Sequence, residues 1–227
     1  MQYWQPLVFN NAQEAFEDLY DRIMLFGHDT EVGTKAIYNI GFSIINPLDN
    51  HIETPWRKWS PKYAEREWLW YLSQNRSVEE IKKYAPIWDK MHGGDNLVMS
   101  NYGWQWGRNN QLEKVIEQLD KNPNTRQAWI SIFDGKEKDF YQHDTPCTLA
   151  VGFDIFEGLL NMCVTMRSCD LIYGFCNDQY CFSKLQEKVA DCLDLPIGAY
   201  YHFAHDLHIY EKHFNLKENE QNTKTNS

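Results

Sequence analysis

The most informative absence in this 227-residue sequence is that of a long apolar run. A helix needs about 18 or more apolar residues to cross a bilayer, and no stretch of the chain supplies them, so we expect no membrane span. Basic residues are also scarce: 22 Lys and Arg stand against 32 Asp and Glu, for a net charge of −10. A nucleic acid needs a basic face, so this charge argues against one as a partner. The first residues lack a basic and then apolar leader pattern, and we expect a cytoplasmic protein.

Cysteine is present but never in the paired spacing that zinc sites use. The six cysteines stand at 147, 163, 169, 176, 181 and 192, and no two form a Cys-x-x-Cys motif. Disulfide frameworks are typical of small secreted domains and not of a chain of this length. The sequence therefore predicts free thiols and no metal site.

The sequence does contain enough apolar and aromatic residues for one large core. Hydrophobic residues make up 43% and aromatic residues 15% of the chain, which excludes a disordered protein. The length suits one core, and no repeat or linker divides it. We therefore predict a single domain over residues 1–216, followed by a polar tail over 217–227.

The periodicity of apolar residues predicts an α+β fold, with strands in the middle of the chain and helices before and after. Glu157-Gly158 predicts a hairpin turn, Gly41 a bulge, and Ser77 with Glu80 a capping box. The expected helices cover 11–26, 61–74, a short segment ending near Pro86, 109–120, 177–193 and 206–214. The expected strands cover 35–45, 127–133, 148–156, 159–167 and 199–204.

Cys147, which follows Pro146 in a loop, is the candidate nucleophile. A thiol attacks as the thiolate, so it needs a lowered pKa, which Arg167 or Arg126 would supply across the hairpin. The alternative is that Cys147 is a small buried hydrophobe, as most cysteines are.

Arg167-Ser168 would bind a phosphate, since the guanidinium holds two oxygens and the hydroxyl a third. The alternative is an ion pair between Arg167 and Asp170. Glu67, on an aromatic helix face, would have a raised pKa and shuttle protons, unless it is a solvated helix residue. His208 and Tyr210 would donate to a sugar hydroxyl or simply pack. These residues alone indicate an enzyme that acts on a small phosphate ester.

Seven motifs fall in one order between about residue 31 and residue 214. They are Glu67 with Trp70, Trp88-Asp89, Tyr102-Gly103-Trp104-Gln105-Trp106, Thr125-Arg126, Pro146-Cys147, the set Arg167, Ser168, Asp170, Gly174 and Asp178, and His208 with Tyr210. In this set the chain resembles the thymidylate synthase superfamily, and within it the phage deoxycytidylate hydroxymethylases. The resemblance implies a thymidylate synthase-like fold, with a mixed or antiparallel sheet flanked by helices and one sheet face packed at a homodimer interface.

The resemblance also implies roles. Cys147 would add to carbon 6 of a pyrimidine nucleoside monophosphate, and carbon 5 would then take a one-carbon unit from 5,10-methylenetetrahydrofolate. The implied catalytic residues are Cys147, Glu67 and Asp178. The implied nucleotide ligands are Arg167, Ser168, Asp178, His208, Tyr210 and, from the partner subunit, Arg126. The implied folate contacts are Asp170, Trp88 and Tyr102.

The position four residues after Gly174 predicts which base is read. Thymidylate synthases have asparagine there, whose amide suits uracil, whereas this chain has Asp178. A carboxylate accepts from the exocyclic amine of cytosine, and a shared proton bridges it to the ring nitrogen, so Asp178 favours cytosine. The alternative is that Asn177 reads the base, which requires a rotation of about 100° on a helix.

The expected product is the hydroxymethyl compound, which arises when water rather than hydride adds at carbon 5. The polar tail and Thr148 after the nucleophile both favour water. Two departures concern the phosphate. Gln127 stands where synthases have a second arginine. The N-terminal phosphate loop of synthases has a basic residue that the nearest match here, Glu31-Val32-Gly33-Thr34-Lys35, lacks at that position, and Lys35 would substitute for it. We therefore expect a deoxycytidylate (dCMP) 5-hydroxymethyltransferase, in the host cytoplasm if the source is viral. The alternatives are a dUMP hydroxymethylase, a CMP hydroxymethylase, a thymidylate synthase, or a relative that only binds a nucleotide or RNA.

Overall fold

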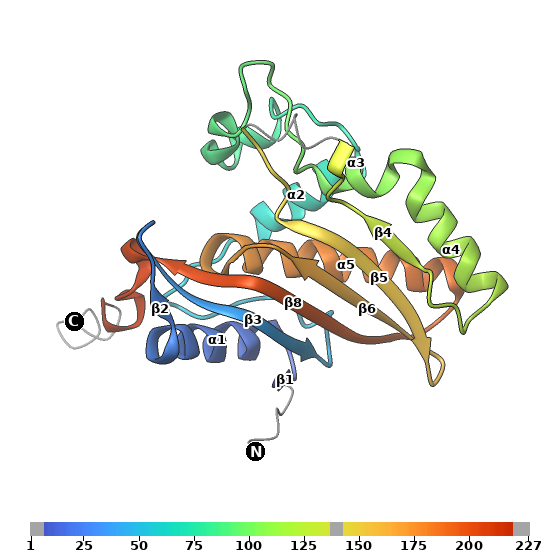
Figure 1. Ribbon diagram of the computed structural model, residues 1–227, viewed down its shortest axis with the longest axis horizontal. Helices are drawn as coiled ribbons and strands as arrows, with labels where there is room; N and C mark the ends of the chain where they lie inside the picture. The colour runs from blue at the N-terminus through green and yellow to red at the C-terminus, as the bar shows by residue number, and fades with distance from the viewer. Residues whose placement is uncertain (1–6, 137–142, 220–227) are drawn as a thin grey trace.

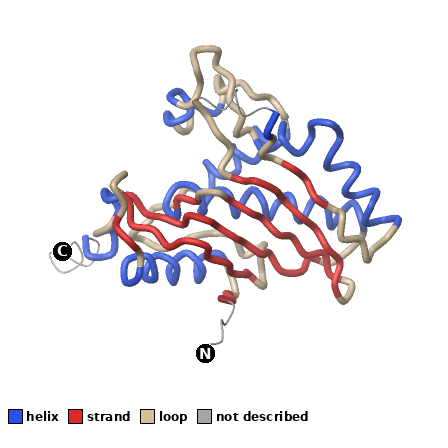
Figure 2. Tube along the Cα trace, viewed as in Figure 1, coloured by secondary structure: helices blue, strands red, loops and turns tan. Residues whose placement is uncertain are grey.

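One mixed sheet organises the protein (Figures 1 and 2). The computed structural model describes residues 7–136 and 143–219. Its sheet has the order β1-β3-β8-β6-β5-β4, with β2 paired to β3 and β7 to β8. The pairs β1–β3, β6–β8 and β7–β8 are parallel, and the other pairs are antiparallel. The strands are β1 (Leu7–Phe9), β2 (His28–Asp29), β3 (Thr34–Ile44), β4 (Trp129–Ser131), β5 (Thr148–Phe156), β6 (Leu159–Met166), β7 (Cys169–Asp170) and β8 (Ile197–Tyr210).

The helices gather on one face of this sheet, so the predicted α+β class is confirmed. α1, α4 and α5 contact the strands directly, and α2 packs on α5 (Figure 1). Side chains cap two helix starts: Asn11 accepts from the amide of Glu14, and Ser60 from that of Tyr63. The helices are α1 (Ala12–Phe26), α2 (Pro61–Leu72), α3 (Tyr102–Gly107), α4 (Gln111–Lys121) and α5 (Cys176–Leu193), with a π-helical turn, η5 (Leu171–Phe175), before α5 and a 3-10 turn, η3 (Arg108–Asn110), before α4.

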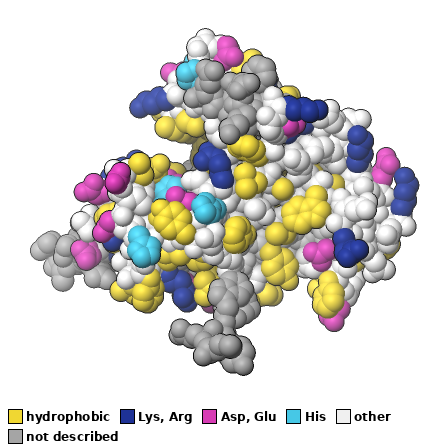
Figure 3. Space-filling view, in the orientation of Figure 1, with side chains coloured by type: hydrophobic (Ala, Val, Ile, Leu, Met, Phe, Trp, Pro, Cys, Tyr) yellow, Lys and Arg dark blue, Asp and Glu magenta, His cyan; other side chains and the backbone are white. Residues whose placement is uncertain are grey.

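The other face of the sheet is open and aromatic. Alternate residues of β8, such as Tyr200 and His202, are buried under the helices, whereas Tyr201 and Phe203 remain 43% and 38% exposed. Tyr38 on β3 and Trp129 on β4 are exposed as well. Figure 3, in the orientation of Figure 1, shows hydrophobic and histidine side chains over this face. An isolated chain therefore leaves an apolar sheet face in water.

The middle hairpin forms as its turn residues predict. β5 and β6 pair in antiparallel register from Thr148↔Met166 to Phe156↔Leu159. Glu157 and Gly158 both have positive φ, 52° and 78°, which a two-residue type I′ turn requires. This hairpin sets the spacing between residues 147 and 167.

The predicted helix over 206–214 is wrong, because β8 continues to Tyr210. Its last residues pair with β3 on one side and β7 on the other, and these hydrogen bonds outweigh the local helical pattern. A single 3-10 turn, η6 (Glu211–His213), follows. The predicted bulge at Gly41 is also wrong, since Gly41 pairs regularly with Phe203.

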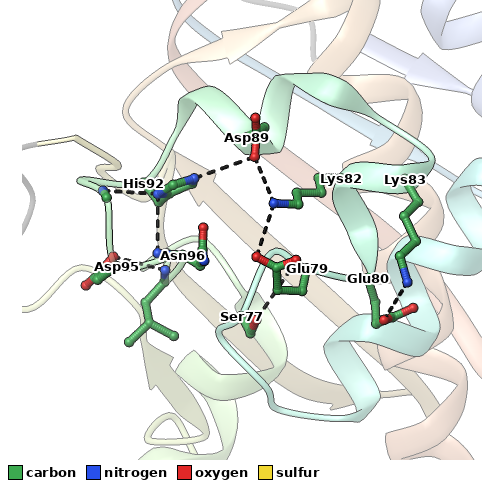
Figure 4. A network of polar contacts seen from close by, with 11 residues as sticks. Ser77, Glu79, Glu80, Lys82, Lys83, Asp89, His92, Asp95 and Asn96 are labelled. Carbon is green, nitrogen blue, oxygen red and sulfur yellow. Dashed lines mark hydrogen bonds and ion pairs between the residues drawn. The ribbon is translucent and has the colours of Figure 1, made fainter.

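The segment after α2 holds two 3-10 turns, η1 (Ile81–Lys83) and η2 (Pro86–Lys90), instead of one capped helix. The predicted capping box does not form, because the carboxylate of Glu80 pairs with Lys83. Lys82 lies between Glu79 and Asp89, at 3.1 and 3.0 Å, and so joins the two turns (Figure 4). These contacts fix η2, which carries Trp88.

Candidate active site

The candidate residues converge at one end of the sheet. Cys147 lies directly before β5 and Arg167 directly after β6, and the backbone amide of Arg167 donates to the carbonyl of Cys147 at 2.9 Å. Asp170 of β7 pairs in register with His208 of β8. Glu67 comes from α2, Tyr102 from α3 and Asp178 from the first turn of α5. Segments that are far apart in the chain therefore build one site.

Arg167 holds the loop that carries the thiol. Its guanidinium donates to the carbonyls of Pro146 and Thr145, at 3.0 and 2.8 Å, and lies 3.8 Å from the Sγ of Cys147. The alternative ion pair with Asp170 does not occur among the described residues. The sequence therefore predicted the neighbour of Cys147 correctly.

The expected lowering of the thiol pKa is wrong. Burial raises the pKa of Cys147 to about 11, and the positive charge of Arg167 offsets this only in part. Three carboxylates, those of Asp178, Asp144 and Asp170, raise it further. The thiol is thus protonated near neutral pH in the free protein, because desolvation of the thiolate outweighs one nearby cation.

The segment that starts α3 makes hydrogen bonds to the residues on both sides of Cys147. Three residues before it, the buried carboxylate of Asp144 accepts from the backbone amide and the hydroxyl of Ser100, both at 2.6 Å. One residue after it, the amide of Thr148 donates to the hydroxyl of Tyr102 at 3.3 Å. The loop with the thiol is thus fastened on both sides.

Glu67 is buried, which excludes the alternative of a solvated helix residue. Burial raises its pKa to about 7, although the hydrogen bond from Tyr71 and the nearby hydroxyl of Tyr63 lower it again. The hydroxyl of Tyr71 donates to Oε1 at 2.8 Å. A carboxyl group that titrates near neutral pH suits the transfer of protons in either direction.

Asp178 faces the site, and Asn177 does not. Burial and the negative charges of Glu67 and Asp170 raise the pKa of Asp178 well above its usual range. The amide of Asn177 is already engaged: it accepts from the indole of Trp59 at 2.9 Å and donates to the carbonyl of Tyr173 at 2.8 Å. Asn177 would have to give up both bonds in order to read a base.

His208 and Tyr210, the two candidate residues on β8, differ in burial. His208 is buried, and its Nδ1 lies 2.9 Å from a carboxylate oxygen of Asp206, which fixes the ring and leaves Nε2 for a ligand. Tyr210 is 41% exposed and packs edge-on against His208, with ring centroids 5.3 Å apart. Ser168 is half-buried beside Arg167.

Arg126 is the predicted residue that the fold does not bring into the site. It is exposed and precedes β4 at the end that lies beside Phe153, because β4 and β5 run antiparallel. Lys35, considered as a substitute phosphate contact, pairs instead with Asp29 at 2.7 Å. Within one chain, Arg167 therefore has no cationic helper from either residue.

Two of the three predicted folate contacts lie inside the site's polar network. The indole of Trp88 donates to the hydroxyl of Tyr63 at 2.9 Å, and Tyr102 is engaged with Thr148. Asp170 alone of the three is half-buried; its carboxylate caps η5 by accepting from the amides of Ile172 and Tyr173.

Sequence reasoning missed Tyr63, Tyr71 and Asp144. Tyr63 and Tyr71 stand four residues before and after Glu67, a helical spacing that places all three on one face, so this signal was available. Asp144 has no such signal, because its partner Ser100 is distant in the chain. No helix of the described part is long and apolar enough to cross a membrane. The same described residues contain no cluster of three His, Cys, Asp or Glu side chains arranged to hold a metal ion.

The fold is that of a known class. The thermostable thymidylate synthase A from Bacillus subtilis is similar, with a TM-score of 0.72 at 20% identity, over 89% of this chain and 81% of that one. The family model for thymidylate synthase matches residues 14–226. The chain therefore belongs to the thymidylate synthase family, whose members are folate-dependent one-carbon transferases.

Individual relatives point to two subgroups of this family. The deoxycytidylate 5-hydroxymethyltransferase of Enterobacteria phage T2 is 31% identical over 71% of this chain and 72% of its own length, and that of phage T4 is 31% identical over 68% and 69%. Thymidylate synthase 1 of Bacillus spizizenii is 28% identical over 70% of this chain but only 60% of its own length.

Proposed function

We propose that the protein is a deoxycytidylate 5-hydroxymethyltransferase. The observation that carries the proposal is the position of Asp178, which interacts electrostatically with Cys147, Glu67 and Tyr102, while the amide of the neighbouring Asn177 is engaged elsewhere. A thiol, a proton-transferring carboxyl group and a carboxyl group that reads the base are the three parts that hydroxymethylation of cytosine needs.

Cys147 acts as the nucleophile at carbon 6 of the ring. Because its pKa is raised to about 11, it keeps its proton until the sulfur adds to carbon 6; the proton then passes through water to the carboxylate of Glu67, and the electron pair of the carbon 5–carbon 6 double bond moves to carbon 5. Arg167, 3.8 Å from the sulfur, stabilises the developing thiolate. Glu67, whose pKa is about 7, takes and returns protons during the later steps.

Asp178 selects cytosine through its proton. Neutral cytosine offers an acceptor at ring nitrogen 3 and a donor at the exocyclic amine, and a protonated carboxyl group matches both. The raised pKa of Asp178 keeps that proton available. Uracil already carries a proton on ring nitrogen 3, so Asp178 cannot share its proton with that nitrogen, and whenever Asp178 is ionised an acceptor oxygen faces the uracil carbonyl with no proton between them, which disfavours uridylate.

The rest of the nucleotide meets His208, Tyr210, Ser168 and Arg167. His208 offers Nε2 to the deoxyribose, since Nδ1 is engaged with Asp206. The phosphate needs a further cation, and Arg126 of a second subunit supplies it in a homodimer formed through the open sheet face. Burial of the exposed aromatic residues of that face favours such a dimer.

The one-carbon donor fits at the edge of the site beside Asp170. That carboxyl group is half-buried and already ordered by two backbone amides, so it can accept from an N–H-rich ring. 5,10-Methylenetetrahydrofolate supplies the one-carbon unit when bound. Trp88 and Tyr102 act indirectly: Trp88 holds the hydroxyl of Tyr63, and Tyr102 holds the backbone amide of Thr148.

A panel of substrates tests the proposal. The protein is incubated with dCMP, CMP, dUMP or no nucleotide, together with formaldehyde and tetrahydrofolate, and the products are identified by mass. We expect 5-hydroxymethyl-dCMP. Methylated uridylate with oxidised folate would identify a thymidylate synthase instead.

The Asp178→Asn variant tests the reader separately. We expect its preference to move toward uridylate by a factor of about 100 or more, because an amide donates to the uracil carbonyl. Release of tritium from carbon 5 of labelled nucleotide measures this for both bases, with Cys147→Ala as the inactive control. An unchanged preference would refute the assignment. Equal release by wild type and Cys147→Ala would indicate a protein that only binds nucleotide.

A further inference from the structure

Glu67 shares its helix face with two tyrosines. Tyr63 and Tyr71 stand one turn before and one turn after it on α2. The hydroxyl of Tyr71 donates to Oε1 of Glu67 at 2.8 Å. The other oxygen, Oε2, is buried and has no hydrogen-bond partner among the described residues. A buried carboxylate oxygen without a partner is costly, which points to a role at this atom.

The direction of each hydrogen bond is fixed by chemistry. The indole of Trp88 can only donate, so the hydroxyl of Tyr63 accepts from it at 2.9 Å, and its own proton lowers the pKa of Glu67 without completing a hydrogen bond to Oε2. Tyr71 has one hydroxyl proton, and it lies on Oε1. Burial raises the pKa of both tyrosines well above the usual value, so they keep these protons. Glu67 is the member of the set that titrates near neutral pH.

We propose that Tyr71 is a positioning residue for Glu67: it holds Oε1, so that Oε2 is the oxygen that exchanges protons with the substrate or an intervening water. The inference rests on the proposed function only for the identity of that substrate. Tyr63, oriented by Trp88, stabilises the charged form of the same carboxyl group but leaves Oε2 without a hydrogen bond.

The hydroxyl of Tyr71 also sets the pH range of the site. Burial raises the pKa of Glu67 to about 7, and donation from Tyr71 lowers it. Removing the donor while keeping the ring raises the pKa further. Less Glu67 is then ionised at pH 7, and reactions that need the carboxylate lose rate on the acid side.

The test compares Tyr71→Phe with Tyr200→Phe. Tyr71 and Tyr200 are equally buried, 1% exposed, but the hydroxyl of Tyr200 bonds His202 and not Glu67. The pKa of Glu67 is measured by carbon-13 NMR of labelled glutamate carboxyl groups, with Glu67→Gln to assign the signal. We expect a midpoint near 7 in wild type and Tyr200→Phe, and about one pH unit higher in Tyr71→Phe. Equal midpoints in all three would overturn the proposal.

A second readout separates this inference from the proposed function. The pH profile of tritium exchange on dCMP should show its acid limb displaced by the same amount in Tyr71→Phe. If wild type exchanges no tritium, the proposed substrate is wrong, whereas the NMR titration still decides the role of Tyr71. If Tyr71→Phe does not fold, Tyr63→Phe should raise the midpoint in the same direction, and an unshifted midpoint there would count against the network.

Discussion

At the scale of single residues, burial moves the pKa values of the thiol and of two carboxyl groups in the site above their ordinary values. Four acidic side chains, those of Glu67, Asp144, Asp170 and Asp178, lie near the thiol of Cys147 and the guanidinium of Arg167. Desolvation raises the pKa of Glu67 and Asp178, so both hold protons near neutral pH more readily than solvated carboxyl groups do. The free protein is therefore arranged to store protons, and not to present a ready thiolate.

The reactivity of Cys147 should reflect this arrangement. We expect alkylation by iodoacetamide to rise with pH toward a midpoint near 11, and to run at pH 7.5 on the order of 100-fold more slowly than for a free cysteine of pKa ~8.5. Arg167→Gln should move the midpoint still higher, since it removes the cation that lowers this pKa. Peptide mass spectrometry distinguishes Cys147 from the exposed Cys192. A midpoint at or below 8.5 would contradict the burial argument.

At the scale of elements, the start of α3 fastens the nucleophile loop. Ser100→Ala removes the hydroxyl that donates to Asp144 at 2.6 Å and leaves the backbone donor in place. We expect a loss of about 1–3 kcal/mol in the free energy of unfolding, measured in urea. We also expect tritium exchange to decrease by about tenfold, because the thiol is then less well aligned with carbon 6 of the pyrimidine.

Ser183→Ala is the matched control for Ser100→Ala. Its buried hydroxyl accepts from Asn50 at 2.8 Å and lies on α5, outside the loop that carries Cys147. We expect a similar loss of stability with exchange unchanged. Equal effects of the two variants on exchange would mean that the Ser100–Asp144 contact has no part in positioning Cys147.

The elements also show where sequence patterns suffice. The hairpin around Glu157-Gly158, helix α1 and the long α5 follow from local signals and were predicted closely. The helix expected over 206–214 failed because pairing of β8 with β3 and β7 is not visible locally. The predicted lowering of the Cys147 pKa was wrong for a similar reason. The order of the motifs places Arg167 beside Cys147, but the burial of the thiol depends on the whole fold.

At the scale of the whole molecule, one arrangement explains both the open sheet face and the position of Arg126 outside the site. Arg126 is exposed at the end of β4 far from its own Cys147, and the face beside it is aromatic. Both features are accounted for if two chains pack face to face and exchange this residue.

Mixing two inactive variants tests this exchange. Cys147→Ser lacks the nucleophile, and Arg126→Gln lacks the phosphate contact, so each alone should be strongly impaired. After refolding together, half of the dimers are mixed and each has one complete site, so about a quarter of wild-type activity should return. No recovery would mean that Arg126 acts within its own chain, and full activity of Arg126→Gln would mean that it has no part.

The position of β8 in the sheet has a consequence for how the chain is made. β8 joins β3, near the start of the chain, to the later group formed by β6, β5 and β4, none of which pairs with β3 in the described sheet. It is also the last strand of the described part. During synthesis the two halves of the sheet must therefore wait with exposed edges until residues 197–210 leave the ribosome. We infer that the closing step of folding is long-range and slow, and that the site, with His208 on that strand, comes into being only then.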